Sequence, residues 1–293
     1  MRVLITGCYG QVGHCLTAQL ADKESTTVQA LDRDQLDITN QNAVNAIVDE
    51  FQPTIIINAA AHTAVDRAED EVDLSYAINR DGPSYLAQAA QRVGAAILHI
   101  STDYVFEGNK VGEYDECDVT HPQGVYGESK LAGESAVANA CDKHIILRTA
   151  WVFGENGNNF VKTMLRLGAT RDELSIVGDQ FGGPTYAGDI ANTLITIAEC
   201  INQGNTVDYG VYHYSGLPHV SWCEFADAIF DIAKVQGVIT TKPRLTSITT
   251  EQYPTPAKRP SNSCLNTNKI TTAFSIEASD WQEALKNIQA YTG

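Results

Sequence analysis

The residues with the clearest chemical potential in this 293-residue chain are Tyr126 and Lys130. They stand four positions apart in a segment predicted to be helical, so both side chains lie on one face of the helix. A phenol can donate a proton to a carbonyl oxygen, and a neighbouring ammonium group stabilises the phenolate and lowers the tyrosine pKa from about 10. The spacing indicates general-acid catalysis of a carbonyl reduction, although it also arises by chance in a chain with twelve tyrosines.

A second group of polar residues follows an apolar run at residues 96–100 that we predict to be a strand. Thr102 and Asp103 come just after it. Open α/β sheets bind ligands beyond the carboxyl ends of their strands, so this position strengthens the catalytic interpretation, and the Thr102 hydroxyl is suited to hydrogen-bond a substrate carbonyl. The next aromatic residues, Tyr104 and Phe106, are explained by packing within a strand at least as well as by stacking on a ligand.

Gly7, Gly10 and Gly13 follow the first apolar run of the chain. The first glycine permits a tight turn, the second lets the backbone approach a pyrophosphate, and the third lets a helix pack closely on the strand. Asp32 follows the second predicted strand and suits a hydrogen bond to an adenosine ribose, whereas Arg33 beside it suits a 2′-phosphate. The motif predicts a site for NADPH or NADH, with a plain glycine-rich connection as the alternative.

The composition, 43% hydrophobic and 19% charged, is that of a folded globular protein. A net charge of -16 disfavours nucleic acid and anionic membrane surfaces as partners, because both repel an acidic protein. The seven cysteines show neither a C-x-x-C pair nor zinc-type spacing, so we expect no structural metal. Scattered cysteines without a signal-like or membrane-length apolar stretch predict a cytoplasmic protein.

Short apolar runs rich in β-branched residues alternate with helix-like segments along the first half of the chain. This alternation predicts an α/β fold with a Rossmann-type doubly wound parallel sheet. The predicted strands cover residues 3–5, 28–31, 55–57, 96–100 and 145–147. The predicted crossover helices cover residues 12–21, 41–51, 72–93 and 126–140.

From about residue 151 the alternation loosens, with turn-rich stretches at residues 154–159 and 179–184. We therefore expect a dinucleotide-binding domain over residues 1–150 and a smaller, mainly substrate-binding part over residues 151–293. Residues 189–202 are predicted to be helical and to pack back on the sheet, so that the two parts are interleaved rather than joined by a linker.

Several motifs together resemble the extended short-chain dehydrogenase/reductase superfamily and, within it, the dTDP-4-dehydrorhamnose reductases. The resemblance runs from the first strand to about residue 268, and the combination is more specific than any single motif. The motifs are GQVG at 10–13, NAAAHTAVD at 58–66, STDYVF at 101–106, VYG at 125–127, KLAGE at 130–134, RTAWVF at 148–153 and YPTPAKRP at 253–260.

The resemblance implies reduction of the C4 ketone of dTDP-4-dehydro-L-rhamnose by NADPH or NADH, a step that yields dTDP-L-rhamnose for surface polysaccharide. It implies that Tyr126 donates the proton, that Lys130 tunes Tyr126 and binds the nicotinamide ribose, and that Thr102 orients the carbonyl. The implied sugar contacts are Thr102, Asp103, Tyr126 and Trp151.

The resemblance also implies a set of cofactor contacts, namely Gly10, Gln11, Val12, Asp32, Asp37, Ile38, Ala61, His62 and Thr63. Ligand contact and a purely structural role in packing, capping or turns both fit Ile38, Ala61, His62, Thr63, Asp103 and Trp151. Arg259, between proline-rich turns, suits either a contact with the nucleotide diphosphate or an ordinary surface position.

The chain departs from the family at His14 and Cys15, where members that dimerise through magnesium carry an acidic residue. A metal-bridged dimer is therefore not expected, while a homodimer of another kind stays open. Gly124, before the catalytic helix, adds backbone freedom there. Two other functions share the fold, a nucleotide-sugar epimerase or dehydratase and a non-catalytic regulatory subunit of the S-adenosylmethionine synthetase type. The complete set of Thr102, Tyr126 and Lys130 favours the reductase.

Overall fold

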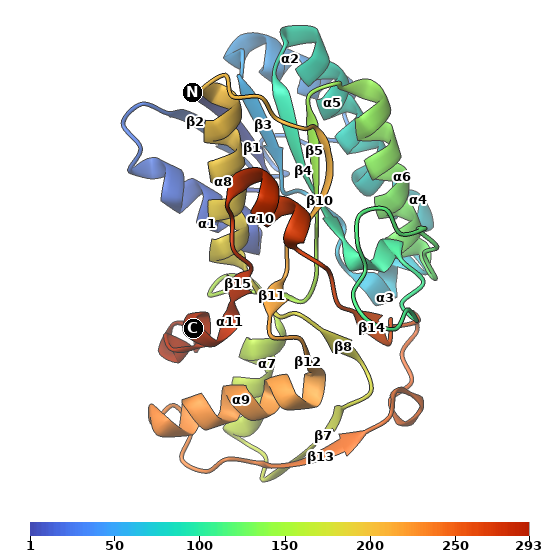
Figure 1. The fold of residues 1–293 in the computed structure, drawn as a ribbon, viewed down its shortest axis with the longest axis vertical. Coiled ribbons are helices and arrows are strands. Elements are labelled where there is room, and N and C mark those ends of the chain that lie inside the picture. The colour runs from blue at the N-terminus through green and yellow to red at the C-terminus, as the bar shows by residue number, and fades with distance from the viewer. Residues whose placement is uncertain (293) are drawn as a thin grey trace.

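The computed structural model describes residues 1–292, and a parallel sheet with helices on both faces forms its upper half in Figure 1. The strand order is β10-β5-β4-β3-β1-β2, and every neighbouring pair is parallel. The predicted Rossmann-type α/β fold is confirmed. The strands are β1 (Arg2–Thr6), β2 (Thr27–Leu31), β3 (Ile55–Asn58), β4 (Ala96–Thr102), β5 (His144–Thr149) and β10 (Gly210–His213).

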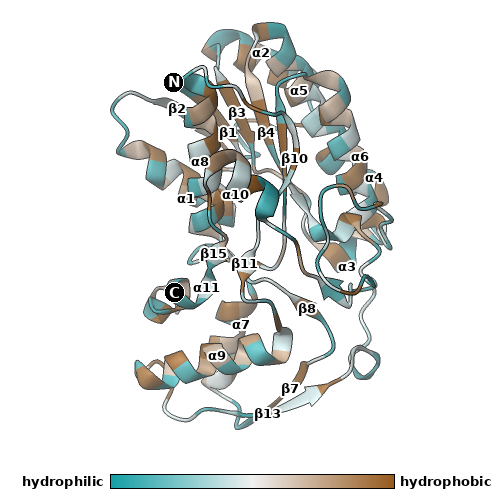
Figure 2. Cartoon of the chain, in the orientation of Figure 1, coloured by the Kyte–Doolittle hydropathy of each residue, from teal (hydrophilic) through white to brown (hydrophobic). Residues whose placement is uncertain are grey.

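Alternate residues of these strands point to opposite faces of the sheet, so the sheet separates two hydrophobic cores. Ile5 and Ile57 belong to one core, and Leu4 and Ile56 belong to the other. Because both faces are covered, the strands are apolar along their length, which the brown central strands of Figure 2 show. The first face carries α1 (Gln11–Ala21), α8 (Ala187–Asn202) and α10 (Asn268–Phe274), and the second carries α2 (Gln41–Phe51), α5 (Gly82–Val93) and α6 (Val125–Ala140).

The edge strand β10 was not among the predicted strands. It is four residues long and contains the polar-tipped side chains of Tyr212 and His213, so it lacks the apolar run that identified the other strands. Both side chains are fully buried, and the Tyr212 hydroxyl donates a hydrogen bond to the backbone oxygen of Asp208 at 2.5 Å. Burial with a satisfied hydroxyl makes this strand compatible with the sheet.

The long helix predicted over residues 72–93 contains an irregular turn. It runs as α4 (Val72–Tyr76), the π-helical turn η1 (Ala77–Asp81) and then α5. Pro83 follows this turn and has no N–H to continue the regular hydrogen-bond pattern. A Cβ placed on Gly133 of α6 would lie 2.0 Å from the backbone oxygen of Asn79, so this glycine allows α6 to pack against the turn.

A smaller half, below the sheet in Figure 1, has its own aromatic core around Phe153, Phe225, Phe230, Trp281 and Tyr291. It is built from short paired strands and two longer helices. Its helices are α7 (Phe160–Gly168), α9 (Trp222–Val235) and α11 (Trp281–Leu285), and its strands are β6 (Val152–Phe153), β7 (Glu173–Val177), β8 (Phe181–Gly182), β9 (Thr185–Tyr186), β11 (Gly216–Leu217), β12 (Val220–Ser221), β13 (Arg244–Ile248), β14 (Asn262–Ser263) and β15 (Ser279–Asp280).

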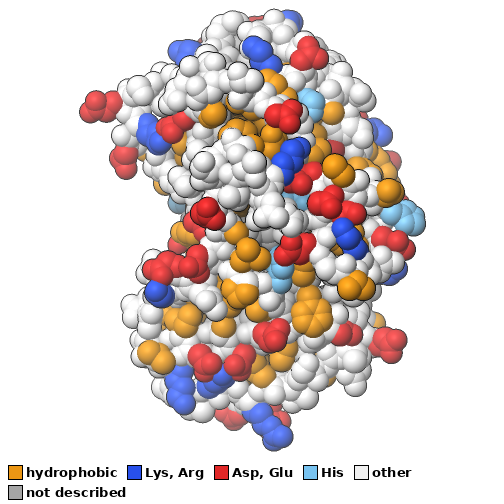
Figure 3. Space-filling view, in the orientation of Figure 1, with side chains coloured by type: hydrophobic (Ala, Val, Ile, Leu, Met, Phe, Trp, Pro, Cys, Tyr) orange, Lys and Arg blue, Asp and Glu red, His pale blue; other side chains and the backbone are white. Residues whose placement is uncertain are grey.

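Four short elements complete the described chain. They are α3 (Val65–Ala68), η2 (Asp103–Val105), η3 (Thr250–Gln252) and η4 (Ile288–Tyr291). Carboxylates, coloured red in Figure 3, are spread over both halves of the face shown. Within residues 1–292, no helix has the length and apolar character needed to cross a membrane.

Candidate active site

The glycine turn between β1 and α1 has the tight geometry that its sequence predicts. Gly7 has a φ of +72°, and a Cβ there would lie 2.7 Å from backbone atoms of Ala60. A Cβ on Gly13 would lie 2.0 Å from the backbone oxygen of Gly7. Larger residues at these two positions would therefore collide with the backbone, while the start of α1 points its free N–H groups toward the turn. This backbone cradle fits a dinucleotide phosphate.

A cavity of about 310 Å³ opens beside the glycine turn. Seven of the expected cofactor contacts line it, namely Gly7, Gly10, Asp32, Asp37, Ile38, Ala61 and His62. Arg33 lines it as well, next to Asp32, so a carboxylate and a guanidinium both face the space where an adenosine ribose would bind. The residue types fit a nicotinamide dinucleotide.

Other expected cofactor contacts lie outside the lining of this cavity. The Val12 side chain is buried in the core on the α1 face of the sheet. Gln11 reaches the lower half, where its Oε1 accepts a hydrogen bond from Asn159 Nδ2 at 3.0 Å. Thr63 is exposed and does not cap α3, whose N-cap is Ala64.

Two residues after β2, the acidic Asp37 and the apolar Ile38, have additional structural roles. Asp37 Oδ1 accepts hydrogen bonds from the Thr39 hydroxyl at 2.7 Å and from its backbone N–H at 2.9 Å, which lower the Asp37 pKa. Ile38 is buried, and a Cβ on Gly82 would lie 2.6 Å from its Cδ1. Ile38 is therefore both part of the cavity lining and a packing residue.

His62 is held in place by a network that the sequence did not reveal. Its backbone N–H donates to Asn79 Oδ1 at 2.8 Å, and Asn79 Nδ2 donates to the His62 carbonyl and to Ser129 Oγ. The ring contacts the Ser75 hydroxyl at 2.9 Å and a Glu71 carboxylate oxygen at 3.1 Å. The π-helical turn thus places one asparagine so that it links the cavity wall to the helix that carries Tyr126 and Lys130.

Tyr126 lies in the first turn of α6, and a carboxylate from another helix caps that turn. Glu69 Oε1 accepts a hydrogen bond from the Val125 N–H at 3.0 Å. A Cβ on Gly124, the N-cap residue, would lie 2.6 Å from this oxygen, so the glycine makes room for Glu69. The carboxylate sits at the positive end of the helix dipole, where it is favoured. Gly124 thereby helps to fix the start of the catalytic helix.

The pKa of Tyr126 departs from its ordinary value in the direction opposite to that expected from a neighbouring lysine. Burial raises it, the charge of Asp103 and the ring of Tyr104 raise it further, and a hydrogen bond with Thr102 acts the other way. The Tyr104 and Tyr126 rings meet edge to face, with centroids 5.3 Å apart. Tyr126 is consequently protonated at neutral pH, which is the state that a proton donor requires.

Lys130 is almost fully buried one helical turn after Tyr126. Its Nζ donates a hydrogen bond to the backbone oxygen of Ile100 at 2.7 Å, which anchors the side chain beneath the end of β4. Burial lowers the pKa of Lys130 to about 8, and the carboxylate of Glu134 opposes this shift. Lys130 therefore changes charge close to physiological pH.

Thr102 and Asp103 form a buried pair at the end of β4. The Thr102 hydroxyl donates to Asp103 Oδ1 at 3.0 Å and accepts a hydrogen bond from the Tyr104 N–H at 3.2 Å. Burial raises the pKa of Asp103 to about 6, although hydrogen bonds from Ser263 and Thr102 pull in the opposite direction. The structure therefore brings Thr102, Asp103 and Tyr126 together.

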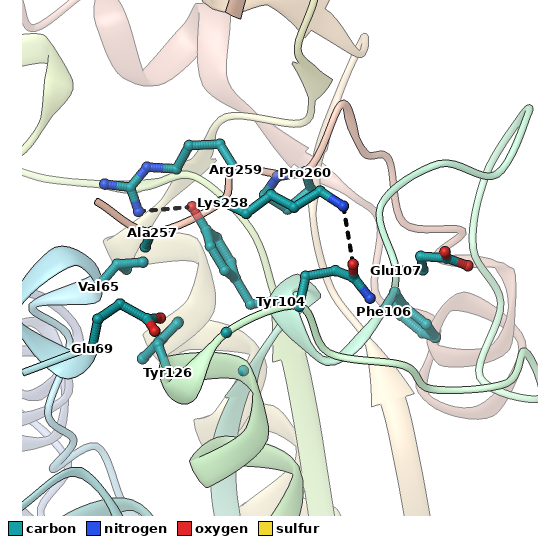
Figure 4. Close-up of a pocket in the computed structure, with 13 residues that line it drawn as sticks. Val65, Glu69, Tyr104, Phe106, Glu107, Tyr126, Ala257, Lys258, Arg259 and Pro260 are labelled. Carbon is teal, nitrogen blue, oxygen red and sulfur yellow. Dashed lines mark hydrogen bonds between the residues drawn. The ribbon is translucent and has the colours of Figure 1, made fainter. Parts of the chain in front are cut away.

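A second pocket lies over the start of α6, and residues from four separate segments line it. Figure 4 shows the Arg259 side chain reaching the Tyr104 hydroxyl, with Glu69 and Tyr126 nearby. Arg259 also forms an ion pair with Asp66 at 2.7 Å. Its side chain is only 22% exposed, so it is not an ordinary surface arginine.

The expectation that Tyr104 and Phe106 belong to a strand is wrong. Strand β4 ends at Thr102, and residues 103–105 form a 3₁₀ turn because Thr102 Oγ1 captures the Tyr104 N–H. The turn directs Tyr104 into the pocket beside Tyr126. Phe106 is buried and stacks on Tyr114, with ring centroids 4.3 Å apart.

Trp151 has an unusual backbone conformation for a tryptophan. Its φ is +49°, in the left-handed region that costs a non-glycine residue roughly 1–3 kcal/mol. The indole is half-buried and stacks on Trp222, with ring centroids 3.5 Å apart. A Cβ on Gly182 would lie 2.6 Å from the indole, so this glycine leaves room for it. Such strain clusters at ligand sites more often than in ordinary cores.

Several lining residues were not anticipated from the sequence. Leu36, Thr39, Ala59, Ala60, Leu74 and Ile78 line the first cavity, and Val65, Glu69, Gln123, Ala257 and Lys258 are among those that line the second. Ala59, Ala60 and Thr39 neighbour predicted contacts, which is a signal that sequence reasoning could have used. Leu74 and Ile78 come from a helix whose apolar residues look like core residues. Among residues 1–292, no group of histidine, cysteine or acidic side chains could hold a metal ion.

Comparisons with known proteins point in one direction. Residues 1–292 match the family model described as RmlD substrate binding domain. The chain is 57% identical to a dTDP-4-dehydrorhamnose reductase of Aggregatibacter actinomycetemcomitans over 99% of both chains. It is 44% identical to the crystal structure of a dTDP-4-dehydrorhamnose reductase from Clostridium acetobutylicum, with a TM-score of 0.89 and 98% of both chains covered. It is 40% identical to that enzyme of Bacillus anthracis in complex with NADP, with a TM-score of 0.90 and 98% and 97% of the two chains covered.

Proposed function

This chain belongs to the RmlD substrate-binding-domain family, and we propose that Tyr126, Lys130 and Thr102 carry out its reaction. That reaction is the NAD(P)H-dependent reduction of the C4 ketone of dTDP-4-dehydro-L-rhamnose to dTDP-L-rhamnose, and the 57% identical relative is named dTDP-4-dehydrorhamnose reductase. The observation that carries the residue assignment is the meeting of Thr102, Asp103 and Tyr126 at the end of β4, above the buried Lys130.

The cofactor binds in the cavity beside the glycine turn. When bound, the reduced nicotinamide supplies a hydride to C4 of the sugar. The N–H groups of the first residues of α1 hold the pyrophosphate, and this requires the close backbone approach that Gly10 permits, whose own N–H donates to the Gly7 oxygen. Asp32 and Arg33 share the adenosine end of the cavity, which supports use of both NADH and NADPH.

Tyr126 gives its phenolic proton to the oxygen of C4 as the hydride reaches the carbon. Tyr126 then recovers its proton from solvent. Thr102 holds the carbonyl oxygen in place by turning its hydroxyl from Asp103 toward the substrate. Lys130 donates hydrogen bonds to the nicotinamide ribose, and its positive charge stabilises the phenolate that forms transiently.

The second pocket and the neighbouring tryptophan pair receive the nucleotide sugar. The Trp151 indole, already stacked on Trp222, offers a flat surface to a deoxysugar ring, and Asp103 offers a carboxylate to its hydroxyl groups. Arg259 and Lys258 line the pocket beside Tyr126 and provide positive charge for the diphosphate.

A cytoplasmic location and the absence of nucleic-acid partners belong to the same proposal. All seven cysteines are free, which suits a reducing compartment, and the acidic surface disfavours nucleic acid. A homodimer is the simplest assembly for such a chain, and the mass of the purified protein in solution tests it.

The decisive experiment follows nicotinamide absorbance with purified protein, NADPH or NADH, and dTDP-4-dehydro-L-rhamnose, beside the Tyr126→Phe variant. The variant lacks the proton donor but keeps the cofactor cavity, so its kcat should fall by about 100- to 10,000-fold while cofactor binding persists. Near-normal turnover by Tyr126→Phe would remove Tyr126 from its role. Sugar conversion without net cofactor oxidation would point to an epimerase instead.

A further inference from the structure

A buried ionic cluster lies one helical turn beyond Lys130 and has no part in the chemistry described above. Glu134 is 4% exposed, and its two carboxylate oxygens accept hydrogen bonds from Arg148 Nε at 2.9 Å and Arg148 Nη2 at 2.6 Å. The Ser101 hydroxyl donates to the same carboxylate at 2.5 Å. One side chain of α6 thereby binds both β4 and β5. Strand β4 ends at Thr102, and β5 ends at Thr149, two residues before Trp151.

The cluster is poorly explained as a device for stability alone. Charges taken out of water pay a large desolvation cost, so buried ion pairs are often no more stable than apolar residues of the same volume. This pair is also incompletely satisfied, because Arg148 Nη1 has no hydrogen-bond partner. An apolar pair would fill the space between α6 and β5 at lower cost. We therefore expect Glu134 to have a role that requires its charge or its hydrogen-bond geometry.

We propose that Glu134 is a positioning residue that keeps Lys130 positively charged and holds it in register with Thr102; this rests on the proposed roles of Lys130 and Thr102. The two residues are four apart in α6, within the KLAGE motif, and share one helix face. Ser101 is covalently next to Thr102, so its hydrogen bond to Glu134 also fixes the strand end that carries Thr102. A single carboxylate thus lies one helical turn from the lysine and is bonded to the strand end that carries the threonine.

The other titratable groups around Lys130 are neutral or paired, and Glu134 is the group that favours the charged ammonium form of Lys130. On α6, Tyr126 is protonated and neutral at physiological pH. From β4, His99 is fully buried with its pKa well below the usual value, so it is neutral as well. From β5, the Arg148 guanidinium is bound to Glu134. Two more carboxylates come from the turn between α3 and α4. Glu69 accepts a hydrogen bond from the Val125 N–H, and Glu71 pairs with Arg67 and His62. Glu134 alone opposes the effect of burial on Lys130.

Removal of the Glu134 charge should lower the pKa of Lys130. The lysine would then lose its proton at a lower pH, and its hydrogen bonds to a cofactor ribose would weaken from that pH upward. In Glu134→Gln we expect the pKa of Lys130 to fall by about one pH unit. The alkaline decline in NADPH affinity and in kcat should move to lower pH by the same amount, while the acidic side of each profile stays in place.

The measurement uses the cofactor-free protein labelled with ¹³C at the lysine Cε, with the Lys130 signal assigned by its absence in Lys130→Met. Chemical shift against pH gives the pKa of Lys130 directly, and fluorescence titration gives the NADPH dissociation constant at each pH. Because Glu134→Gln leaves Arg148 as an unpaired buried charge, the double variant Glu134→Gln/Arg148→Met is measured too. Glu134→Asp, which restores the carboxylate, should recover most of the wild-type pKa.

Glu128→Gln is the matched control, since it removes a carboxylate from the exposed side of the same helix and should leave the pKa of Lys130 unchanged. A folded double variant with a wild-type Lys130 pKa and an unshifted alkaline decline would overturn the proposal. Failure of the proposed function would look different. The wild-type enzyme would then not oxidise NADPH with the sugar, yet the Lys130 pKa would still respond to Glu134.

Discussion

The two proposed ligand-binding regions of this molecule are built in different ways. The cofactor cavity is formed mostly by residues 7–39 and 59–62, whose backbone follows the ends of adjacent parallel strands. The proposed substrate pocket is formed by residues 65–69, 104–107, 123–127 and 257–260, which lie far apart in the sequence. The shape of the first region is determined by the backbone conformation, and the shape of the second is determined by contacts among side chains from distant segments. A site of the first kind has a local sequence signature, whereas a site of the second kind does not.

The glycine turn offers the largest test of this difference. Gly13→Ala forces a Cβ to within 2.0 Å of the Gly7 oxygen, so we expect a loss of about 3 kcal/mol in unfolding free energy together with loss of cofactor binding. Gly10→Ala places its Cβ 3.3 Å from the same oxygen, so the fold should persist. Gly10→Ala should nevertheless weaken NADPH binding about 100-fold, because the pyrophosphate can no longer approach the backbone N–H groups.

Thermal unfolding and NADPH titration of both variants separate the two roles. Gly94→Ala is the control, since Gly94 has a positive φ like Gly7 but an open space around its Cβ position and no place in either site. It should cost about 1 kcal/mol of stability, because L-residues rarely adopt this φ, and it should leave cofactor binding unchanged. Normal NADPH affinity in Gly10→Ala would mean that the pyrophosphate does not contact this turn, and the backbone-defined view of the cavity would fail.

Arg259 tests the region that depends on side chains. If it contacts the diphosphate, Arg259→Gln removes a charged hydrogen bond worth about 2 kcal/mol, which corresponds to a KM for the nucleotide sugar raised about 30-fold. NADPH affinity should not change, because Arg259 is absent from the lining of the cofactor cavity. Steady-state kinetics against each substrate in turn measures this split.

The control for this prediction is Arg244→Gln, which removes the same charge from an arginine of β13 whose side chain is 79% exposed. Both kinetic constants should stay at their wild-type values there. An unchanged sugar KM in Arg259→Gln would assign Arg259 to its ion pair with Asp66 alone. The second pocket would then be held together by a structural contact rather than prepared for a diphosphate.

The same contrast explains which parts of the molecule could be predicted from the sequence. Four sheet strands, β1, β3, β4 and β5, were predictable because they are buried on both faces, which leaves nearly continuous apolar runs. The edge strand β2 is only partly buried, and it was predicted from a run that contains Gln29. The short strand β10 was missed because its burial depends on neighbours contributed by Phe106 and Lys269, which contact His213 and Tyr212. Gly7 and Gly13 were predictable because the backbone geometry excludes other residues there.

The parts that could not be predicted arise from tertiary contacts. Asn79 is an ordinary helical residue in the sequence, and only the π-helical turn brings it to both His62 and Ser129. The expected effect of Lys130 on the Tyr126 pKa followed from their spacing alone. In the folded chain burial outweighs any such effect and raises the pKa, because desolvation acts through the whole surrounding structure. Spacing predicts which groups are near one another but not how much water surrounds them.

Asp103, buried at the end of β4 beside Thr102, offers a test of stability against pH. Its backbone begins the 3₁₀ turn that follows β4, while its carboxylate faces Ser263 from the distant C-terminal part of the chain. Its folded pKa of about 6 lies above the ordinary value of 3.8, so the folded state favours the protonated carboxyl. The stability that this group contributes is fully present below pH 3.8 and is lost as the pH rises through about 6.

Asp103→Asn removes this ionisation while an amide oxygen still accepts the Thr102 hydroxyl. The variant should be more stable than the wild type by about 3 kcal/mol at pH 7.5, and the difference should become small near pH 4. Thermal unfolding against pH measures it, with Asp172→Asn as the control because that carboxylate is exposed. If Asp103 also binds the sugar, the stabilised variant will have a higher sugar KM with unchanged NADPH affinity. A variant less stable than the wild type at pH 7.5 would show that hydrogen bonds from Ser263 and Thr102 outweigh the cost of burying the charge.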